Sequence, residues 1–314
     1  MEKHRALVEE HIAKWTGSLP DDPLYAPMAY LLQLPAKRVR PLLTLMACEL
    51  FGGKPEDVLN EAVAIELFHN FTLMHDDLMD RSQLRRGEAT VHEKWNANTA
   101  ILSGDALLVK AYQLMGLDPA ALTIFNRYAL EVCEGQQKDM AFETRSDVSL
   151  DKYREMIRLK TAVLLACALK IGACKAGASV EDQERIGVFG ESLGLAFQLR
   201  DDLLDAFGDQ SIVGKQIGGD LRVGKKTWLL IRGTEVSKIN GDKTLANELA
   251  KPSASRNVEA MISTLRSLGV HHEAEAEIER LEALAGNQLD TIGVPEARKT
   301  PLRDLVAELQ ARVA

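Results

Sequence analysis

Two short stretches of the chain each place three aspartates at the end of an apolar run. "FTLMHDDLMD" runs from Phe71 to Asp80, and "FQLRDDLLDAFGD" runs from Phe197 to Asp209. The aspartates are Asp76, Asp77 and Asp80 in the first stretch and Asp201, Asp202 and Asp205 in the second. Carboxylates are among the side chains least often buried without a partner. One such cluster could arise by chance, whereas two clusters indicate a common cause.

Helical geometry would arrange these carboxylates in polar stripes. At about 100° per residue, Asp76 and Asp80 differ by about 40° around the helix and share a face. His69 falls between them in azimuth, so one polar stripe follows an otherwise apolar helix. The second stretch predicts a stripe of the same kind, formed by Gln198, Asp201 and Asp205.

Paired carboxylates at this spacing suit a hard divalent cation. Magnesium takes oxygen ligands, keeps several waters and bridges protein carboxylates to substrate phosphates. Without cations, carboxylates packed this closely would repel one another and lose hydration. A solvated acidic helix end would explain a single copy of the motif. Two copies, each ending an apolar helix, favour metal binding.

Several basic clusters complement the acidic ones. They comprise Lys37, Arg38 and Arg40 in "KRVRP", Arg85 and Arg86 in "RRG", Lys160, and the lysines Lys215, Lys225 and Lys226. Each residue alone is typical of a solvated surface. An arginine guanidinium can donate two parallel hydrogen bonds to phosphate oxygens, and a lysine ammonium supplies a compact positive charge. Together with two metal motifs, the clusters indicate a ligand that carries several negative charges.

The elements that must position these groups are helices. Apolar residues at spacings of three and four predict helices over residues 58–80, 99–115, 161–177 and 182–208. A long Gly/Lys-rich loop is predicted over residues 214–226. No series of alternating strands is apparent, so the chain is predicted to form one all-α domain.

The bulk composition excludes several classes of protein. The 314 residues are 46% hydrophobic, which is enough for a sizeable core. A formal net charge of −8 gives no general electrostatic reason to bind nucleic acid. The most apolar run, "TAVLLACAL", is too short to span a membrane. The cysteines Cys48, Cys133, Cys167 and Cys174 lie in helical stretches and are expected to be buried, reduced thiols of a cytoplasmic protein.

With these motifs, the chain resembles the trans-isoprenyl diphosphate synthases, which form the polyprenyl synthetase family. The matching elements, in order, are "KRVRP", "ELFHNFTLMHDDLMD", "RRG", "LSGDALL", "EGQQKD", "KTA", "FQLRDDLLD" and "GKQIGGDLRVGKKT". The resemblance implies a single all-α domain over residues 1–314, built as a helical bundle around a deep central cavity of the isoprenoid synthase type. It also implies a homodimer and about three magnesium ions. One departure is Ala36, where the family usually has glycine, and this change is expected to affect the turn rather than the ligands.

The resemblance also assigns roles to individual residues. Isopentenyl diphosphate would condense with dimethylallyl, geranyl or farnesyl diphosphate, and the released pyrophosphate would take the proton. Asp76, Asp80 and Asp201 would be the main magnesium ligands, supported by Asp77, Asp202 and Asp205. The allylic diphosphate would contact Arg85, Lys160, Lys215 and Lys225, while Thr161 and Gln198 orient the allylic group. Isopentenyl diphosphate would be held by Lys37, Arg40, His69 and Arg86.

Product length is expected to depend on bulk upstream of the first aspartate motif. Phe71 and Thr72 stand five and four residues before Asp76, and Phe68 lies one turn deeper as a second floor. An aromatic residue followed by a small one resembles geranylgeranyl diphosphate synthases, so geranylgeranyl diphosphate is the expected product and farnesyl diphosphate the alternative.

Other classes remain as rival interpretations. A class I terpene cyclase would normally carry a different second metal motif and would need no isopentenyl site. A non-catalytic partner subunit would commonly lack one aspartate motif, and both are intact here. A helical scaffold protein would have no use for either stripe.

Overall fold

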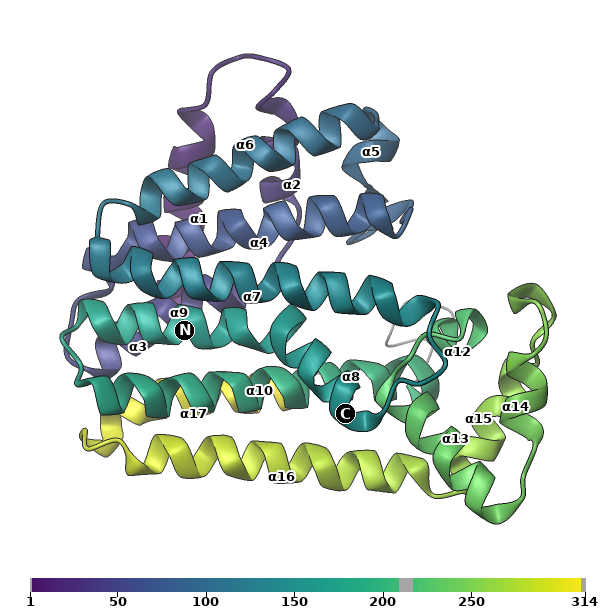
Figure 1. The fold of residues 1–314 in the computed structure, drawn as a ribbon. Coiled ribbons are helices and arrows are strands. Elements are labelled where there is room, and N and C mark those ends of the chain that lie inside the picture. The colour runs from purple at the N-terminus through teal and green to yellow at the C-terminus, as the bar shows by residue number, and fades with distance from the viewer. Residues whose placement is uncertain (1, 209–216, 312–314) are drawn as a thin grey trace. The chain divides into compact units, whose positions relative to one another are not determined.

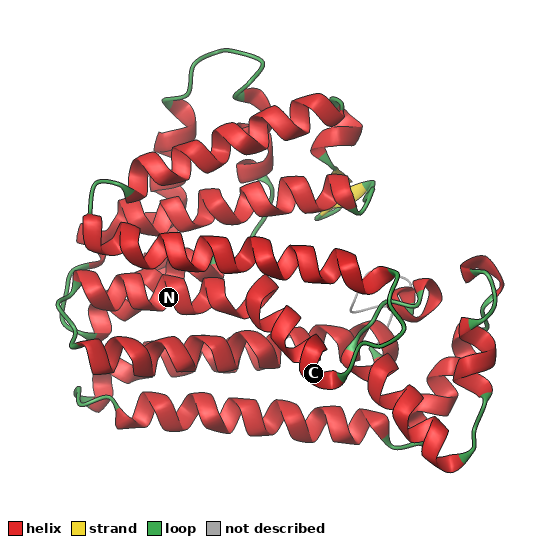
Figure 2. Cartoon of the chain, in the orientation of Figure 1, coloured by secondary structure: helices red, strands yellow, loops and turns green. Residues whose placement is uncertain are grey.

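The structure is a computed structural model that describes residues 2–208 and 217–311. Figure 2 shows that these residues are mostly helical, joined by loops and turns, with one short two-stranded hairpin. The predicted all-α class is therefore confirmed.

The chain forms two compact units, each assembled from segments that are distant in sequence. The first comprises Met1–Arg127, Cys167–Gly187 and Gly293–Leu305, and the second comprises Tyr128–Ala166, Val188–Ile292 and Val306–Ala314. The chain passes between the units inside helices α7, α9, α10 and α17. The expectation that residues 1–314 act as a single domain stays a prediction.

The first unit holds the N-terminal elements of the chain (Figure 1). They are α1 (Glu2–Gly17), α2 (Ala26–Gln33), α3 (Val39–Leu50), the 3-10 turn η1 (Pro55–Val58), α4 (Leu59–Met79), β1 (Leu84–Arg85), β2 (Glu88–Ala89), α5 (Val91–Lys94), α6 (Ala97–Met115) and the start of α7 (Pro119–Glu143).

The second unit holds most of the remaining elements. They are α8 (Leu150–Ile157), the π-helical turn η2 (Arg158–Ala162), α9 (Val163–Lys175), α10 (Val180–Phe207), α12 (Gly219–Val223), α13 (Trp228–Asn240), α14 (Thr244–Leu249), the 3-10 turn η3 (Ser253–Ser255), α15 (Val258–Ser267), α16 (Val270–Thr291) and α17 (Glu296–Ala311). Most of α9 and of α17 and the start of α10 belong to the first unit, while the rest of α7 belongs to the second.

Helix α4 is the buried centre of the first unit, with α6 running beside it (Figure 1). Apart from Glu66, every residue from Ala62 to Phe68 is at most 1% exposed. A helix that is apolar on nearly all sides must be covered on all of them. Further along, Met74 packs with Leu31, Val91 and Ala100. These contacts hold the polar last turn of α4 in place.

The second unit holds α10 in a comparable way. Tyr153, Leu199, Ala206 and Trp228 share one core cluster with residues of α13, α15 and α16. An ion pair between Arg200 and Glu282 also ties α10 to α16. The C-terminal turns of α10 therefore have fixed backbone positions.

The structure differs from the sequence predictions in three places. The expectation of four buried cysteines holds for Cys48 and Cys167 only, since Cys174 is partly buried and Cys133 is exposed. Cys133 lies outside the buried stripe of α7 that contains Tyr128, Ala129 and Val132. Within the predicted loop over residues 214–226, Gly219–Val223 form helix α12. The "RRG" motif forms a hairpin that the sequence did not predict.

None of the helices in the described ranges combines the length and the apolar character that crossing a bilayer requires.

Gly172 provides a test of how closely the helices of the first unit pack. A β-carbon added at Gly172 would lie 2.1 Å from the backbone oxygen of Thr44 and 3.0 Å from the backbone nitrogen of Cys48. We expect Gly172→Ala to lower the free energy of unfolding by about 2 kcal/mol, because backbone atoms must move apart. Urea denaturation followed by circular dichroism would measure the change.

Gly286→Ala is the matched control, since no atom lies within 4 Å of an added β-carbon at this helical position. It should stabilise the protein by about 0.5–1 kcal/mol through helix propensity and chain entropy. Equal effects of the two substitutions would contradict the close approach of α9 and α3.

Candidate active site

The first aspartate motif occupies the C-terminal end of α4. Asp76 and Asp80 lie one turn apart, with Asp76 half-buried and Asp80 exposed. Carboxylates are unfavourable at this end of a helix, where the dipole already places negative charge. The arrangement is therefore suited to binding cations and costs stability without them.

Asp77 has a different position from its two neighbours. It is 2% exposed, and its two oxygens accept hydrogen bonds from Arg85 Nε and Nη2 at 2.6 and 2.7 Å. Such a two-point pair is among the strongest side-chain contacts and fixes the plane of the guanidinium. The motif thus separates into two accessible carboxylates and one that holds an arginine.

The "RRG" motif has a simple local explanation. Arg85 pairs with Glu88 across the hairpin, so Arg86 and Gly87 form a two-residue turn. Both have positive φ, 55° and 85°, as the type I′ turn of a tight hairpin requires. Arg85 on the strand reaches Asp77, while Arg86 Nη1 donates to the backbone oxygen of Leu34 at 3.5 Å.

A second group of cations surrounds His69 on α4. Arg40 Nη1 donates to His69 Nε2 at 3.0 Å. Burial lowers the pKa of Arg40 to about 10, against the opposing effect of the Glu66 carboxylate, so Arg40 remains charged at neutral pH. Burial, and then the charges of Arg40 and Arg86, hold the pKa of His69 well below its ordinary value. His69 is therefore a neutral ring with its proton on Nδ1.

Lys37 and Arg38 complete the basic cluster, in different ways. Lys37 is exposed on the segment before α3, whereas Arg38 is buried. The replacement of glycine by Ala36 is expected to affect the turn before α3. In this turn the left-handed residue is Arg38, and Ala36 has no positive φ.

The residues expected to limit product length form an aromatic group on α4. The ring of Phe71 lies 5.5 Å from Phe68 and 4.8 Å from His75, measured between centroids. Phe68 in turn meets Phe125 edge-on at 5.2 Å. Thr72 Oγ1 donates to the backbone oxygen of His69 at 2.8 Å, so its hydroxyl bonds within its own helix.

The second aspartate motif lies on the last turns of α10. Asp201 is exposed and Asp205 half-buried, and both line a cavity of 360 Å³ with Asp220 and Lys225. The backbone nitrogen of Asp220 donates to Asp205 Oδ2 at 3.0 Å. Lys225 Nζ lies 3.9 Å from Asp220 Oδ1. Lys215 falls outside the described residues.

Asp202 is 5% exposed and accepts hydrogen bonds on both oxygens. Tyr153 donates its hydroxyl to Oδ2, and Gln198 Nε2 donates to Oδ1 at 3.2 Å. Burial nevertheless raises the pKa of Asp202 to about 7. Asp202 thus resembles Asp77, because its oxygens are occupied by protein donors.

Lys160 and Thr161 lie in the π-helical turn η2, a type of local widening that is frequent at functional sites. Lys160 Nζ bonds Asp139 Oδ2 at 2.6 Å, and Thr161 Oγ1 donates to Gln198 Oε1 at 3.2 Å. A β-carbon at Gly135 would lie 2.2 Å from the backbone nitrogen of Lys160, so only glycine allows α7 this close to the turn.

Four site residues were not predicted from the sequence: Glu66, Asp139, Tyr153 and Asp220. Asp139 stands at the end of the "EGQQKD" motif and Asp220 within the Gly/Lys-rich segment, so motif membership was an available signal for both. Tyr153 offered no comparable signal.

The accessible carboxylates fit magnesium. Among the described residues, no three His, Cys, Asp or Glu side chains form a ready-made metal cluster. Each unit instead offers a pair of carboxylates one turn apart, Asp76 with Asp80 and Asp201 with Asp205. Magnesium commonly binds in this manner, with one or two carboxylates and with substrate phosphates completing its shell.

The chain is similar to known proteins of one family. The polyprenyl synthetase family profile matches residues 21–265. A geranylgeranyl diphosphate synthase from Methanosarcina mazei is 42% identical over 219 residues, which cover 68% of each chain. A crystal structure of a geranylgeranyl pyrophosphate synthase is 40% identical, with a TM-score of 0.94, covering 99% of this chain and 98% of its own.

A third comparison concerns a structure with bound ligands. The geranylgeranyl pyrophosphate synthase from Corynebacterium glutamicum, complexed with isoprenyl diphosphate and magnesium, is 28% identical with a TM-score of 0.87, covering 99% of both chains. The family profile, the isoprenoid synthase fold and these relatives show that the chain belongs to the polyprenyl synthetase family.

Proposed function

We propose that this trans-prenyltransferase condenses isopentenyl diphosphate with allylic diphosphates and releases geranylgeranyl diphosphate as its main product. The observation that carries the proposal is a second cation group, around His69, beside the arginine that Asp77 holds. Arg40, His69 and Arg86 lie beside Glu66, whereas Arg85 is held by Asp77. Two distinct anion sites fit an enzyme with two diphosphate substrates better than a cyclase with one. The similarity to geranylgeranyl diphosphate synthases supports the product.

The aspartate motifs serve the allylic diphosphate. Asp76 and Asp80 of α4 and Asp201 and Asp205 of α10 hold magnesium, with about three ions in all. Magnesium supplies positive charge to the departing diphosphate, where negative charge grows in the transition state. Arg85, Lys160, Lys225 and Lys215 add fixed positive charge. Asp77 and Asp202 act as supports, since their oxygens already accept protein hydrogen bonds.

The proposed reaction breaks one carbon–oxygen bond and forms one carbon–carbon bond. The carbon–oxygen bond to the allylic diphosphate breaks, and the allylic carbon becomes a cation. The double bond of isopentenyl diphosphate supplies the electron pair for the new carbon–carbon bond. A proton then leaves the adjacent carbon for the released diphosphate, which restores a double bond in the longer product.

Thr161 and Gln198 orient the allylic group. The Thr161 hydroxyl donates to Gln198, and Gln198 donates to Asp202. Because Asp202 is buried and also accepts from Tyr153, this chain of hydrogen bonds has a fixed end. The oxygen dipoles of Thr161 and Gln198 are then held in one orientation for the developing cation.

Isopentenyl diphosphate binds to Lys37, Arg40, His69 and Arg86. The charged arginines contact the phosphate oxygens, and the neutral His69 holds Arg40 through its unprotonated Nε2. The site needs no metal, because its own side chains supply the positive charge.

The growing prenyl chain stops where it meets the Phe71 ring. The small side chain of Thr72 leaves space beside this ring, and Phe68 would stop a chain that passes it. The Phe71 ring contacts the rings of Phe68 and His75, and these contacts fix its position.

The active form is proposed to be a homodimer. Helix α6 exposes Ile101, Leu102 and Val109, and large apolar side chains gathered on one helix are typical of protein interfaces.

Incubation of the purified protein with magnesium, isopentenyl diphosphate and dimethylallyl diphosphate tests the function. We expect geranylgeranyl diphosphate as the main product after chromatography. Asp76→Asn should lower the turnover number by about 100-fold, because one charge that holds magnesium is lost. Asp57→Asn, an exposed carboxylate in η1, is the control and should keep activity within about twofold of the wild type.

Each other outcome has a meaning in this assay. Farnesyl diphosphate as the end product would replace the proposed product, a cyclic hydrocarbon would indicate a terpene cyclase, and inert protein would indicate a partner subunit. Full activity of Asp76→Asn would remove Asp76 from the magnesium ligands.

Phe71→Ala tests the proposed floor. Removing the ring should shift the products to chains longer by at least one isoprene unit, as measured by mass spectrometry. Leu73→Ala is the control, since Leu73 lies about 200° around the helix from Phe71. An unchanged product distribution in Phe71→Ala would show that the chain ends elsewhere.

A further inference from the structure

Arg38 has an unusual backbone conformation. It precedes the first turn of α3 with φ of 50° and ψ of 37°, in the left-handed region. Glycine is the residue that takes this conformation without strain. Arg38 is also only 3% exposed. A large charged residue at a buried, strained position indicates that its side chain is needed there.

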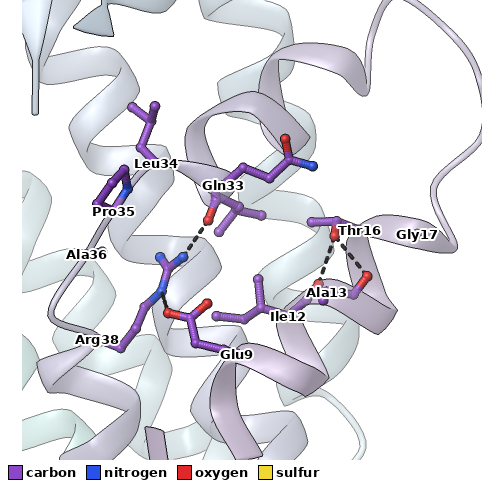
Figure 3. Close-up of a pocket in the computed structure, with 11 residues that line it drawn as sticks. Glu9, Ile12, Ala13, Thr16, Gly17, Gln33, Leu34, Pro35, Ala36 and Arg38 are labelled. Carbon is purple, nitrogen blue, oxygen red and sulfur yellow. Dashed lines mark hydrogen bonds and ion pairs between the residues drawn. The ribbon is translucent and has the colours of Figure 1, made fainter. Parts of the chain in front are cut away.

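The Arg38 guanidinium joins three segments of the first unit. Its Nε donates to Glu9 Oε1 of α1 at 2.9 Å, and its Nη1 donates to Glu66 Oε1 of α4 at 2.8 Å. Its Nη2 donates to the backbone oxygen of Leu32 near the end of α2. Figure 3 shows the guanidinium between Glu9 and the end of α2, beside a cavity of 640 Å³.

Glu66 is the buried end of this network. Its side chain and that of Arg38 are each 2% exposed. Asn70 Nδ2 also donates to Glu66 Oε1, at 3.1 Å. A buried carboxylate of this kind becomes costly when its cation is removed. Glu66 also favours the charged forms of Arg40 and Arg86, so it lies within the electrostatic reach of the proposed isopentenyl diphosphate site.

The neighbours of Arg38 in the sequence are the proposed ligands of that site. Lys37 directly precedes it, and Arg40 follows in the first turn of α3. The backbone oxygen of Arg38 accepts from the nitrogen of Leu42 at 3.1 Å, which begins the helix. The conformation at residue 38 therefore sets the directions in which Lys37 and Arg40 project.

We propose that Arg38, held by Glu66 and Glu9, is the positioning residue of the isopentenyl diphosphate site. Its buried guanidinium fixes the left-handed turn at residue 38. This turn places the side chains of Lys37 and Arg40 so that they contact the two ends of one diphosphate. Arg38 itself does not touch the substrate. This inference rests on the proposed function. It adds Arg38 to the residues that the site requires, although its guanidinium is directed into the protein interior.

Arg38→Lys separates positioning from charge, because lysine keeps the charge and loses the planar fork. In the full-length chain, we expect the Kd for isopentenyl diphosphate, measured by calorimetry without metal, to rise about 10-fold. The KM for isopentenyl diphosphate should rise equally, while the KM for dimethylallyl diphosphate stays within about twofold. Arg40→Ala serves as the positive control for loss of isopentenyl diphosphate binding.

Lys170→Met is the stability control. Lys170 is a buried cation of the same unit, is paired with Glu184 at 2.5 Å and is not one of the proposed ligands. It should lower the melting temperature and leave the Kd for isopentenyl diphosphate unchanged. If Arg38→Lys does not fold, Glu9→Gln weakens only the half-exposed arm of the network and should raise this Kd about threefold.

Wild-type affinity in Arg38→Lys, or in Glu9→Gln if only that variant folds, would overturn the positioning role. Parallel losses for both substrates and for kcat in Arg38→Lys would also overturn it, since a merely structural residue has that effect. A wild-type protein that neither binds isopentenyl diphosphate nor elongates any allylic substrate would instead refute the proposed function.

Discussion

A charge that leaves water needs a partner, and this constraint orders the polar groups of both units. Glu66 meets Arg38, Asp77 meets Arg85, and Asp202 meets the hydroxyl of Tyr153. In each pair a buried carboxylate is satisfied by the protein and fixes a neighbouring segment. Asp76, Asp80 and Asp201 are more exposed than these three carboxylates, and they are the ones proposed to bind the ligand. In each unit, we therefore propose that the buried carboxylates hold position and that the exposed ones meet the substrate.

Much of this arrangement could be predicted from short-range patterns. The predicted helices over residues 58–80 and 182–208 correspond to Leu59–Met79 and Val180–Phe207. They could be located because apolar spacing within one helix depends on neighbours only a few residues away. The spacing of Asp76 and Asp80 has the same local origin, since one helical turn brings the two carboxylates to one face.

The remaining features depend on contacts that are distant in the sequence. Nothing local distinguishes Arg38 from Lys37 or Arg40, and only the pairing with Glu66 reveals that it points inward. Lys160 could be recognised as a ligand candidate, but its partner Asp139 and the π-helical turn depend on the approach of α7 at Gly135. A signal did exist for Glu66, because a single glutamate within the apolar run Ala62–Phe68 requires a buried cation.

The hairpin turn has one consequence for handedness. Gly87 has a φ of 85°, yet no atom lies within 4 Å of where a β-carbon would stand. Space is therefore available, and only the chirality of an ordinary amino acid excludes a side chain at this position. A mirror-image residue such as D-alanine, introduced by chemical ligation, would adopt the same backbone angles without strain. The glycine of "RRG" thus meets a stereochemical requirement of the turn, which Arg86 shares at its lower φ of 55°.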